Sequence, residues 1–106
     1  MATLQHHYTN RDGFNGIRSA KVWRFIASKP PCEHPKGTYF TDLDERTPRL
    51  AQRLRIPREK LQYVFAFNDA GDLRRLEGGR GRYVFYAIMD YAVEEARQTR
   101  HGEVAQ

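Results

Sequence analysis

The stretch Leu61-Gln-Tyr-Val-Phe-Ala-Phe67 decides the fold class of this chain. Its odd-numbered positions are all large apolar or aromatic residues, so they fall on one face of an extended backbone. The sequence Asn-Asp-Ala-Gly at 68–71 then predicts a turn that ends the strand. A β-strand over 61–67 is therefore the element from which the rest of the interpretation starts.

Four further segments have the alternation or the apolar content of strands, at 4–9, 22–27, 37–43 and 83–89. The last is apolar on both faces and is predicted to be a central strand covered on both sides. Helices are expected over 13–20, from Thr47-Pro48 to the residue before Pro57, and over 90–100. Residues 101–106 are expected to fray. These elements predict one α+β domain over residues 1–106, with a small antiparallel or mixed sheet and two or three short helices.

Composition limits the classes of function. The chain has 106 residues and a formal net charge of +5, and fourteen of its 18 basic residues are Arg. Arg forms planar contacts with phosphate and carboxylate, so acidic partners such as nucleic acid, nucleotide phosphates or an acidic protein are expected. No apolar run is long enough to span a membrane, and the N-terminus lacks the apolar stretch of a signal peptide, so we expect no membrane partner and a cytoplasmic location. The single cysteine excludes an internal disulfide and fits a reducing compartment.

Two segments carry side chains typical of a ligand site. In His6-His7-Tyr8-Thr9, a histidine and a hydroxyl two residues later point to the same side of the first predicted strand. Such a pair can hydrogen-bond a ribose or a carboxamide, and the alternative is a surface histidine. In the segment 37–42, Tyr39 and Thr41 share a face. Tyr39 is either a stacking platform for a flat heteroaromatic ligand or a core aromatic residue.

In this order and spacing, His7-Tyr8-Thr9, Gly16-Ile17-Arg18-Ser19 and Gly37-Thr38-Tyr39-Phe40-Thr41-Asp42-Leu43 resemble a known family. They are similar to the small ADP-ribosyltransferase domains of bacterial polymorphic toxins, on the diphtheria-toxin and poly-ADP-ribose-polymerase side of that superfamily. The resemblance implies a split-sheet fold that takes NAD as substrate, cleaves the nicotinamide–ribose bond and transfers ADP-ribose to a macromolecular acceptor. It also implies an immunity protein or antitoxin as partner, and a site of action in the cytoplasm of the producer or of a target cell.

The resemblance also gives the motif residues their roles. His7 would bind a ribose hydroxyl, the backbone of Tyr8 would hold the carboxamide, and Thr9 would contact ribose or support His7. Tyr39 would stack on the nicotinamide ring and act with His7 in catalysis. The remaining NAD contacts would be Gly16, Thr41 and Leu50, the last standing where many relatives have a second aromatic residue. This hypothesis requires His7 and Tyr39 to face one cleft from adjacent strands, and side chains on opposite sides of the sheet would contradict it.

The catalytic carboxylate is the remaining part of the expected site. Cleavage of the glycosidic bond develops positive charge on the ribose, and a carboxylate usually stabilises that charge. Glu77, which precedes Gly78-Gly79, is the first candidate, and Asp90, Glu94 and Glu95 follow.

Other clusters permit other readings. His6, His7, Cys32 and His34 match no standard zinc spacing, so no metal site is expected. The glycine-rich stretch at 78–81 is flanked by arginines that would bind pyrophosphate or the target, or simply form a solvated hairpin: Arg74, Arg75, Arg80 and Arg82. Two functions without NAD stay open. One is a basic nucleic-acid-binding module that stacks bases on exposed Tyr8, Tyr63 or Tyr83, and the other is a ribonuclease-type toxin that uses His6 or His7 with Arg.

Overall fold

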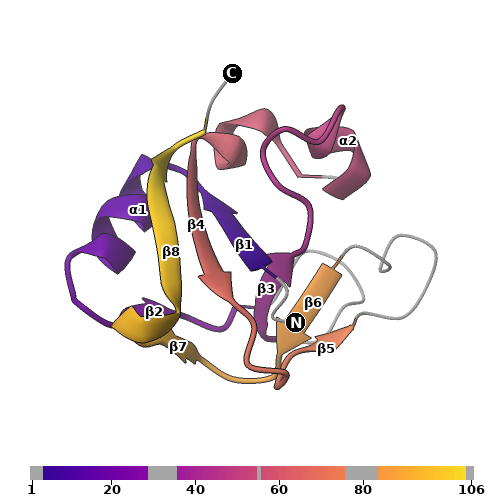
Figure 1. The fold of residues 1–106 in the computed structure, drawn as a ribbon. Helices are drawn as coiled ribbons and strands as arrows, with labels where there is room; N and C mark the ends of the chain where they lie inside the picture. Colours follow the sequence, from indigo (N-terminus) through magenta and orange to yellow (C-terminus); the bar gives the residue numbers. More distant parts are fainter. Residues whose placement is uncertain (1–3, 29–35, 55, 76–83, 105–106) are drawn as a thin grey trace.

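The structure is a computed structural model, and it describes residues 4–28, 36–54, 56–75 and 84–104. The main sheet has six strands in the order β5-β6-β3-β1-β4-β8, and every pairing in it is antiparallel (Figure 1). Its strands are β1 (Leu4–Thr9), β3 (Thr38–Thr41), β4 (Tyr63–Asn68), β5 (Arg74–Arg75), β6 (Val84–Ala87) and β8 (Gln98–Glu103). A second sheet pairs β2 (Trp23–Phe25) with β7 (Tyr91–Val93). Two α-helices, α1 (Arg11–Arg18) and α2 (Leu50–Leu54), and the 3-10 turns η1 (Arg58–Leu61) and η3 (Glu95–Arg97) complete the described fold. The predicted α+β class with an antiparallel sheet is confirmed.

Strand β4 lies between β1 and the edge strand β8, and it is the most deeply buried strand of the sheet. All four residues 64–67 are completely buried. The predicted alternation is confirmed, because Phe65 and Phe67 belong to the main aromatic core and Tyr63 packs against it. The strand begins at Tyr63 rather than Leu61, because Leu61 is the last residue of the turn η1.

One face of the main sheet carries an aromatic core. Helix α1 contributes Phe14 to it, and the second sheet contributes Trp23, Phe25, Tyr91 and Val93. These side chains pack on the strand residues Phe40, Phe65 and Phe67. Several ring pairs meet edge to face, a favourable geometry for aromatic contacts. The two-stranded sheet and α1 therefore act together as the cover of this face.

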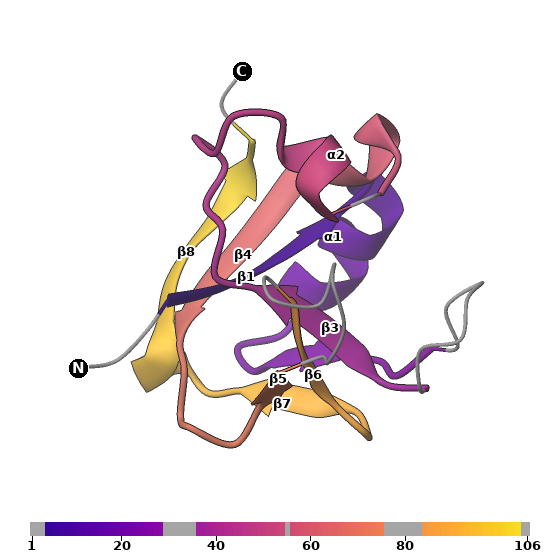
Figure 2. The same cartoon turned by 90° about the vertical axis from the view of Figure 1, so that its right-hand side faces the viewer.

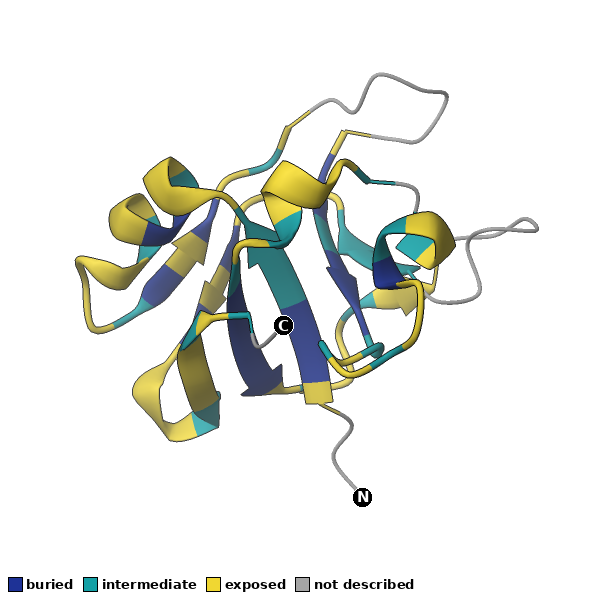
Figure 3. Ribbon diagram, turned by 90° about the horizontal axis from the view of Figure 1, so that it is seen from above, coloured by how far each residue is buried: buried dark blue, intermediate teal, exposed yellow. Residues whose placement is uncertain are grey.

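The opposite face is covered by the segment that follows β3. The Tyr8 hydroxyl donates to the Leu43 carbonyl over 2.8 Å, and Arg100 of β8 forms an ion pair with Glu45. Leu50, the first residue of α2, is buried outside the aromatic core. Because both faces are covered, β4 is dark over most of its length in Figure 3 and β1 is dark in part, whereas the helices and turns are largely exposed.

The predicted helix over 90–100 is wrong, and so is the expected fraying for residues 101–103. Residues 91–93 form β7, residues 95–97 form a 3-10 turn, and residues 98–103 form β8 along the edge of β4. Tyr91 and Val93 are buried while Ala92 between them is exposed, which is a strand period rather than a helical one. The weak helical pattern of this segment is overridden by pairing with β2 and β4.

The apolar segment 83–89 is not covered on both sides as predicted. Residues 84–87 form β6, which lies between β3 and the two-residue strand β5 and is only half-buried. Ile88 and Met89 leave the sheet and are exposed. Apolar composition on both faces was therefore a poor guide to the burial of this strand.

The helix starts differ from those predicted. Helix α1 begins at Arg11, because the Asn10 side chain caps it by accepting from the Gly13 amide over 3.0 Å. Helix α2 begins only at Leu50, because Arg49 has a φ of 56° and interrupts the helical path after Thr47-Pro48. None of the described helices has the length and apolar composition that crossing a bilayer requires.

Candidate functional site

The main sheet is weakly joined at its centre, between β1 and β3. β1 pairs with β4 along all six of its residues, and β3 pairs with β6 along all four. Between β1 and β3, however, the ladder contains the single pair His6–Thr41. Figure 2 shows the two strands diverging from that point. The backbone of residues 7–9 is thus not paired with β3, although the two strands are neighbours in the sheet order.

His7 lies where the strands diverge. Its Nδ1 is 3.1 Å from the Tyr39 carbonyl oxygen. A carbonyl only accepts, so Nδ1–H donates and Nε2 of the neutral ring is the acceptor. The ring packs against Phe25 and Phe40, with centroids at 4.7 and 5.7 Å. Burial lowers the pKa of His7 from 6.5 to about 4, the hydrogen bond to Tyr39 opposes that shift, and the charge of Lys60 adds to it. His7 is therefore a neutral imidazole held in one tautomer.

His6 has a different environment on the other face of β1. It is 3% exposed, and its Nδ1 is 3.2 Å from the Thr41 carbonyl oxygen. Its ring stacks near the Tyr8 ring. Burial lowers the pKa of His6, and hydrogen bonding to Thr41 opposes that shift. Both histidines thus bridge β1 to β3 through β3 carbonyls, one on each side of the sheet.

The side chains of His7 and Tyr39 do not face the same cleft. The Tyr39 ring stacks on Tyr86 with a centroid separation of 5.8 Å. Its neighbour Phe40 points into the aromatic core, where it meets His7, and successive strand residues point to opposite faces. The requirement that both rings line one cleft is not met. The structure joins His7 to the backbone of Tyr39 rather than to its ring.

Tyr8 and Thr41, two further predicted contacts, are engaged within the chain. The Tyr8 side chain lies on the His6 face and donates to Leu43, and burial raises its pKa. The Thr41 hydroxyl is buried and accepts from the Leu43 amide over 3.1 Å. The side chains of both residues therefore have hydrogen-bond partners within the chain.

Thr9, Gly16 and Leu50 have distinct positions. A Cβ on Gly13 would lie 2.1 Å from the Thr9 hydroxyl oxygen, so Thr9 packs directly against the start of α1. Gly16 is exposed on α1, and a Cβ there would meet nothing within 4 Å. Leu50 is buried at the start of α2. No described contact joins these three residues into one cluster.

The candidate carboxylates are only partly described. Glu77 lies outside the described residues. The Asp90 carboxylate accepts from the Ala27 amide over 2.7 Å, and therefore fixes the end of β2 to the start of β7. Glu94 and Glu95 are exposed around the turn η3 rather than on a helix. None of these three described carboxylates has a contact with His7.

The remaining predicted clusters divide between described and undescribed parts. Cys32, His34, Arg80, Arg82 and Tyr83 all lie outside the described residues. Arg74 and Arg75 form the exposed strand β5, and the Arg75 guanidinium lies 5.0 Å from the Phe85 ring centroid. Within the described ranges, no three His, Cys, Asp or Glu side chains gather as metal ligands would.

Sequence reasoning missed one polar feature beside the junction. Gln5 is completely buried and neither of its amide atoms has a hydrogen-bond partner, and the same holds for the buried Oδ1 of Asp42. Continuing the antiparallel register from the His6–Thr41 pair places Gln5 opposite Asp42. Buried polar atoms without partners are rare in proteins. No composition or motif signal distinguished these two residues beforehand.

Comparison with known proteins adds no relative: no family model matches the sequence, and no curated protein or solved structure matches it either. The resemblance of the three motifs therefore stands on the residues themselves.

Proposed function

We propose that this chain is an NAD-dependent ADP-ribosyltransferase of bacterial toxin type, with its NAD site at the junction of β1 and β3. The enzyme would cleave the nicotinamide–ribose bond and pass ADP-ribose to a protein or nucleic acid. This function makes an immunity protein or antitoxin the expected partner and the cytoplasm the expected place of action.

The observation that carries the proposal is the position of His7. The motif histidine lies where the strand ladder ends, and its ring tautomer is fixed by the Tyr39 carbonyl. A neutral imidazole with Nε2 as acceptor is suited to a ribose hydroxyl, which is a donor. The neighbouring backbone of Tyr8 and Thr9 is unpaired on the β3 side, and a carboxamide needs one donor and one acceptor in fixed positions. The split sheet implied by the motifs would correspond to this divergence.

The original form of the hypothesis, in which the rings of His7 and Tyr39 line one cleft, is contradicted by their positions on opposite faces of the sheet. The proposal therefore keeps His7 and changes the role of Tyr39. Its ring lies on the far face against Tyr86, so it does not stack on a nicotinamide held beside His7. Its contribution is the carbonyl that orients His7. Tyr39 is therefore a positioning residue in this account.

The described environment of the same residues disfavours the two alternatives. A ribonuclease needs a histidine that exchanges protons near neutral pH, but burial lowers the pKa of both His6 and His7. A nucleic-acid-binding module needs free aromatic platforms. Tyr8 is hydrogen-bonded and half-buried, and Tyr63 is stacked on Phe14 with centroids 4.4 Å apart.

The test is release of nicotinamide from NAD, measured with purified protein and with cell lysate as a source of acceptors. The wild type should release nicotinamide and label an acceptor. The variant His7→Gln should lose most of this activity, since one amide group cannot keep the hydrogen bond to the Tyr39 carbonyl and also accept from a ribose hydroxyl as the second ring nitrogen would. Glu77→Gln tests the undescribed carboxylate in the same assay.

The variant Tyr39→Leu distinguishes the positioning role of Tyr39 from a stacking role. Tyr39→Leu keeps the backbone carbonyl and removes the ring, so it should retain nicotinamide release if the ring is not a stacking platform. Loss of release in Tyr39→Leu, with an unchanged thermal midpoint, would restore the stacking role and contradict the positioning role. A wild type that neither binds nor cleaves NAD, with lysate present, would refute the proposed enzyme.

A further inference from the structure

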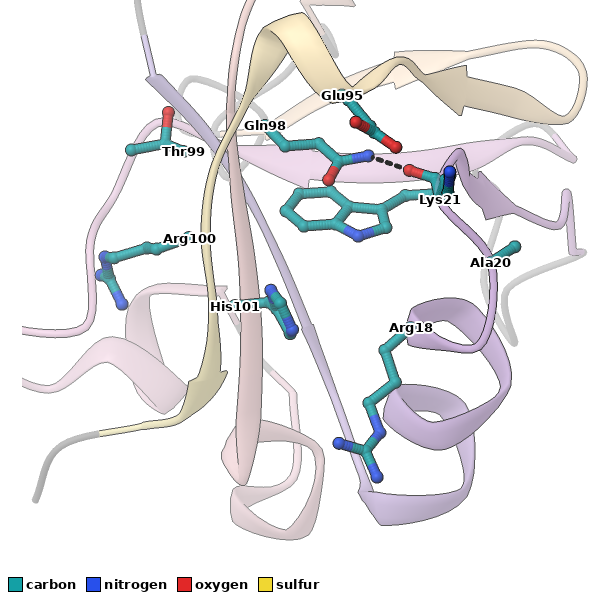
Figure 4. Close-up of a pocket in the computed structure, with 9 residues that line it drawn as sticks. Arg18, Ala20, Lys21, Glu95, Gln98, Thr99, Arg100 and His101 are labelled. Atoms are coloured by element: carbon teal, nitrogen blue, oxygen red, sulfur yellow. Dashed lines mark hydrogen bonds between the residues drawn. The ribbon is translucent and has the colours of Figure 1, made fainter.

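A polar hollow lies between the end of α1 and the edge strand β8, and His7 is not among the residues that line it. It has a volume of about 390 Å³ and is open to solvent. Arg18 and Lys21 line it on one side, Gln98 and His101 on the other, and Trp23 lies between them. Figure 4 shows the Arg18 and His101 side chains extending toward the same space from α1 and β8. The aromatic core separates this hollow from His7, because Phe65 pairs with His7 on one side and with His101 on the other.

The cations of this hollow are not neutralised within the described residues. The described ion pair joins Arg100 to Glu45, and Figure 4 shows the Arg100 side chain directed away from the hollow. Arg18 and Lys21 are exposed and form no ion pair with any described residue. The Arg18 guanidinium lies 5.3 Å from the Phe14 ring centroid, which helps to hold it in place.

The other polar groups define which ligand the hollow suits. The indole N–H of Trp23 has no acceptor among the described residues. His101 is exposed at its edge but stacked on Phe65, with centroids 5.9 Å apart. The Gln98 side-chain N–H groups are already used within the chain, because they donate to the Lys21 and Val93 carbonyls. Glu95 is the one carboxylate among the lining residues, and it is exposed.

We propose that the hollow between α1 and β8 is a binding site for a phosphate group, held by Arg18 and Lys21 and assisted by Trp23 and His101. Arg and Lys donors without acidic partners favour an anion with several acceptor oxygens. The volume lies in the range of small-molecule sites, so the phosphate can be free or carried by a nucleotide. The proposal is independent of NAD cleavage at His7.

The fluorescence of Trp23 tests the site directly, because it is the single tryptophan of the chain. Inorganic phosphate, added at constant ionic strength, should change the emission in a saturable way. Chloride should not. Parallel titrations with AMP and adenosine distinguish the sources, since AMP should bind more tightly than phosphate only if the nucleoside also occupies the hollow.

Two arginines provide a matched comparison. Arg18→Gln should raise the dissociation constant for phosphate roughly tenfold or more, because it removes a charge-assisted hydrogen bond. Arg24→Gln removes the same charge from the exposed face of β2, next to Trp23 in sequence, and should leave the constant unchanged. No saturable change in the wild type, or equal weakening in both variants, would overturn the proposal. NAD cleavage that persists in Arg18→Gln would show that the two sites are separate.

Discussion

At the scale of single residues, His7 is expected to make the stability of the fold depend on pH. A desolvated histidine ring makes the folded state bind protons less readily than the unfolded chain does, and the His7 side chain is half-buried. The pKa of His7 is about 4 in the folded state, against an ordinary value of 6.5. The contribution of His7 to the free energy of unfolding is therefore fully present above pH 6.5 and is lost as the pH falls toward 4. This link between protonation and folding is independent of any ligand.

We therefore expect His7→Gln to reduce the dependence of stability on pH. Between pH 7 and pH 5 the wild type should lose about 2 kcal/mol more of its free energy of unfolding than the variant does, since one pKa unit corresponds to about 1.4 kcal/mol. Urea unfolding at both pH values measures this difference. Equal losses in the two proteins would mean that His7 is not desolvated as described.

Gly37 is a second residue with a specific steric role. A Cβ at this position would lie 2.3 Å from the backbone carbonyl oxygen of Ala87, which cannot turn aside as a side chain would. Gly37→Ala should therefore lower the free energy of unfolding by roughly 1–3 kcal/mol.

Gly16 is the matched control for that substitution. A Cβ there meets nothing within 4 Å, and alanine favours helix. Gly16→Ala should preserve stability or raise it by up to about 1 kcal/mol. If chemical denaturation shows the two alanine variants to be equally stable, the close approach of Gly37 to β6 is wrong.

At the scale of elements, a strand was predictable where large side chains recur at every second position. The alternation at 61–67 identified β4, and the segments at 4–9 and 37–43 identified β1 and β3 within a few residues. The C-terminal strands were not predictable in this way. Residues 98–103 read Gln-Thr-Arg-His-Gly-Glu, and their strand conformation depends on pairing with β4, which only the folded chain supplies.

The candidate site, too, was predictable from the sequence only in part. The sequence predicted that His7 and Tyr39 lie in one site, and a hydrogen bond joins the His7 ring to the Tyr39 carbonyl although the two rings lie on opposite faces. It could not show that the contact uses the Tyr39 carbonyl, because side-chain motifs carry no information on where a ladder ends. Gln5 and Asp42 were missed for a related reason, since their lack of partners is a property of packing.

Hydrogen exchange tests the difference in burial between the strands β4 and β6. β4 has neighbours on both sides and is buried on both faces, whereas β6 is half-buried beside the two-residue strand β5. Amides of β4 should exchange at least about tenfold more slowly than those of β6, since local opening is easier where fewer contacts are buried. Comparable rates in the two strands, followed by NMR, would contradict the deeper burial of β4.

At the scale of the whole molecule, the charge of +5 can now be related to particular surfaces. Arg100 is used within the fold by its pair with Glu45, and Arg97 donates to Asn68 and Tyr91. Tyr91 in turn donates to Asp72, and burial raises its pKa to about 12. Arg18 and Lys21 remain exposed beside the hollow at β8. Part of the basic composition thus serves internal contacts, and Arg18 and Lys21 are the cations of the proposed phosphate site.

The central claim is that NAD binds at the junction of β1 and β3 through His7, and calorimetric titration with NAD tests it most directly. The account predicts binding by the wild type and by Tyr39→Leu, and a dissociation constant roughly tenfold higher or more for His7→Gln, because a hydrogen bond to the ligand is lost. Absence of binding by the wild type, or equal affinity of His7→Gln and the wild type, would contradict the claim.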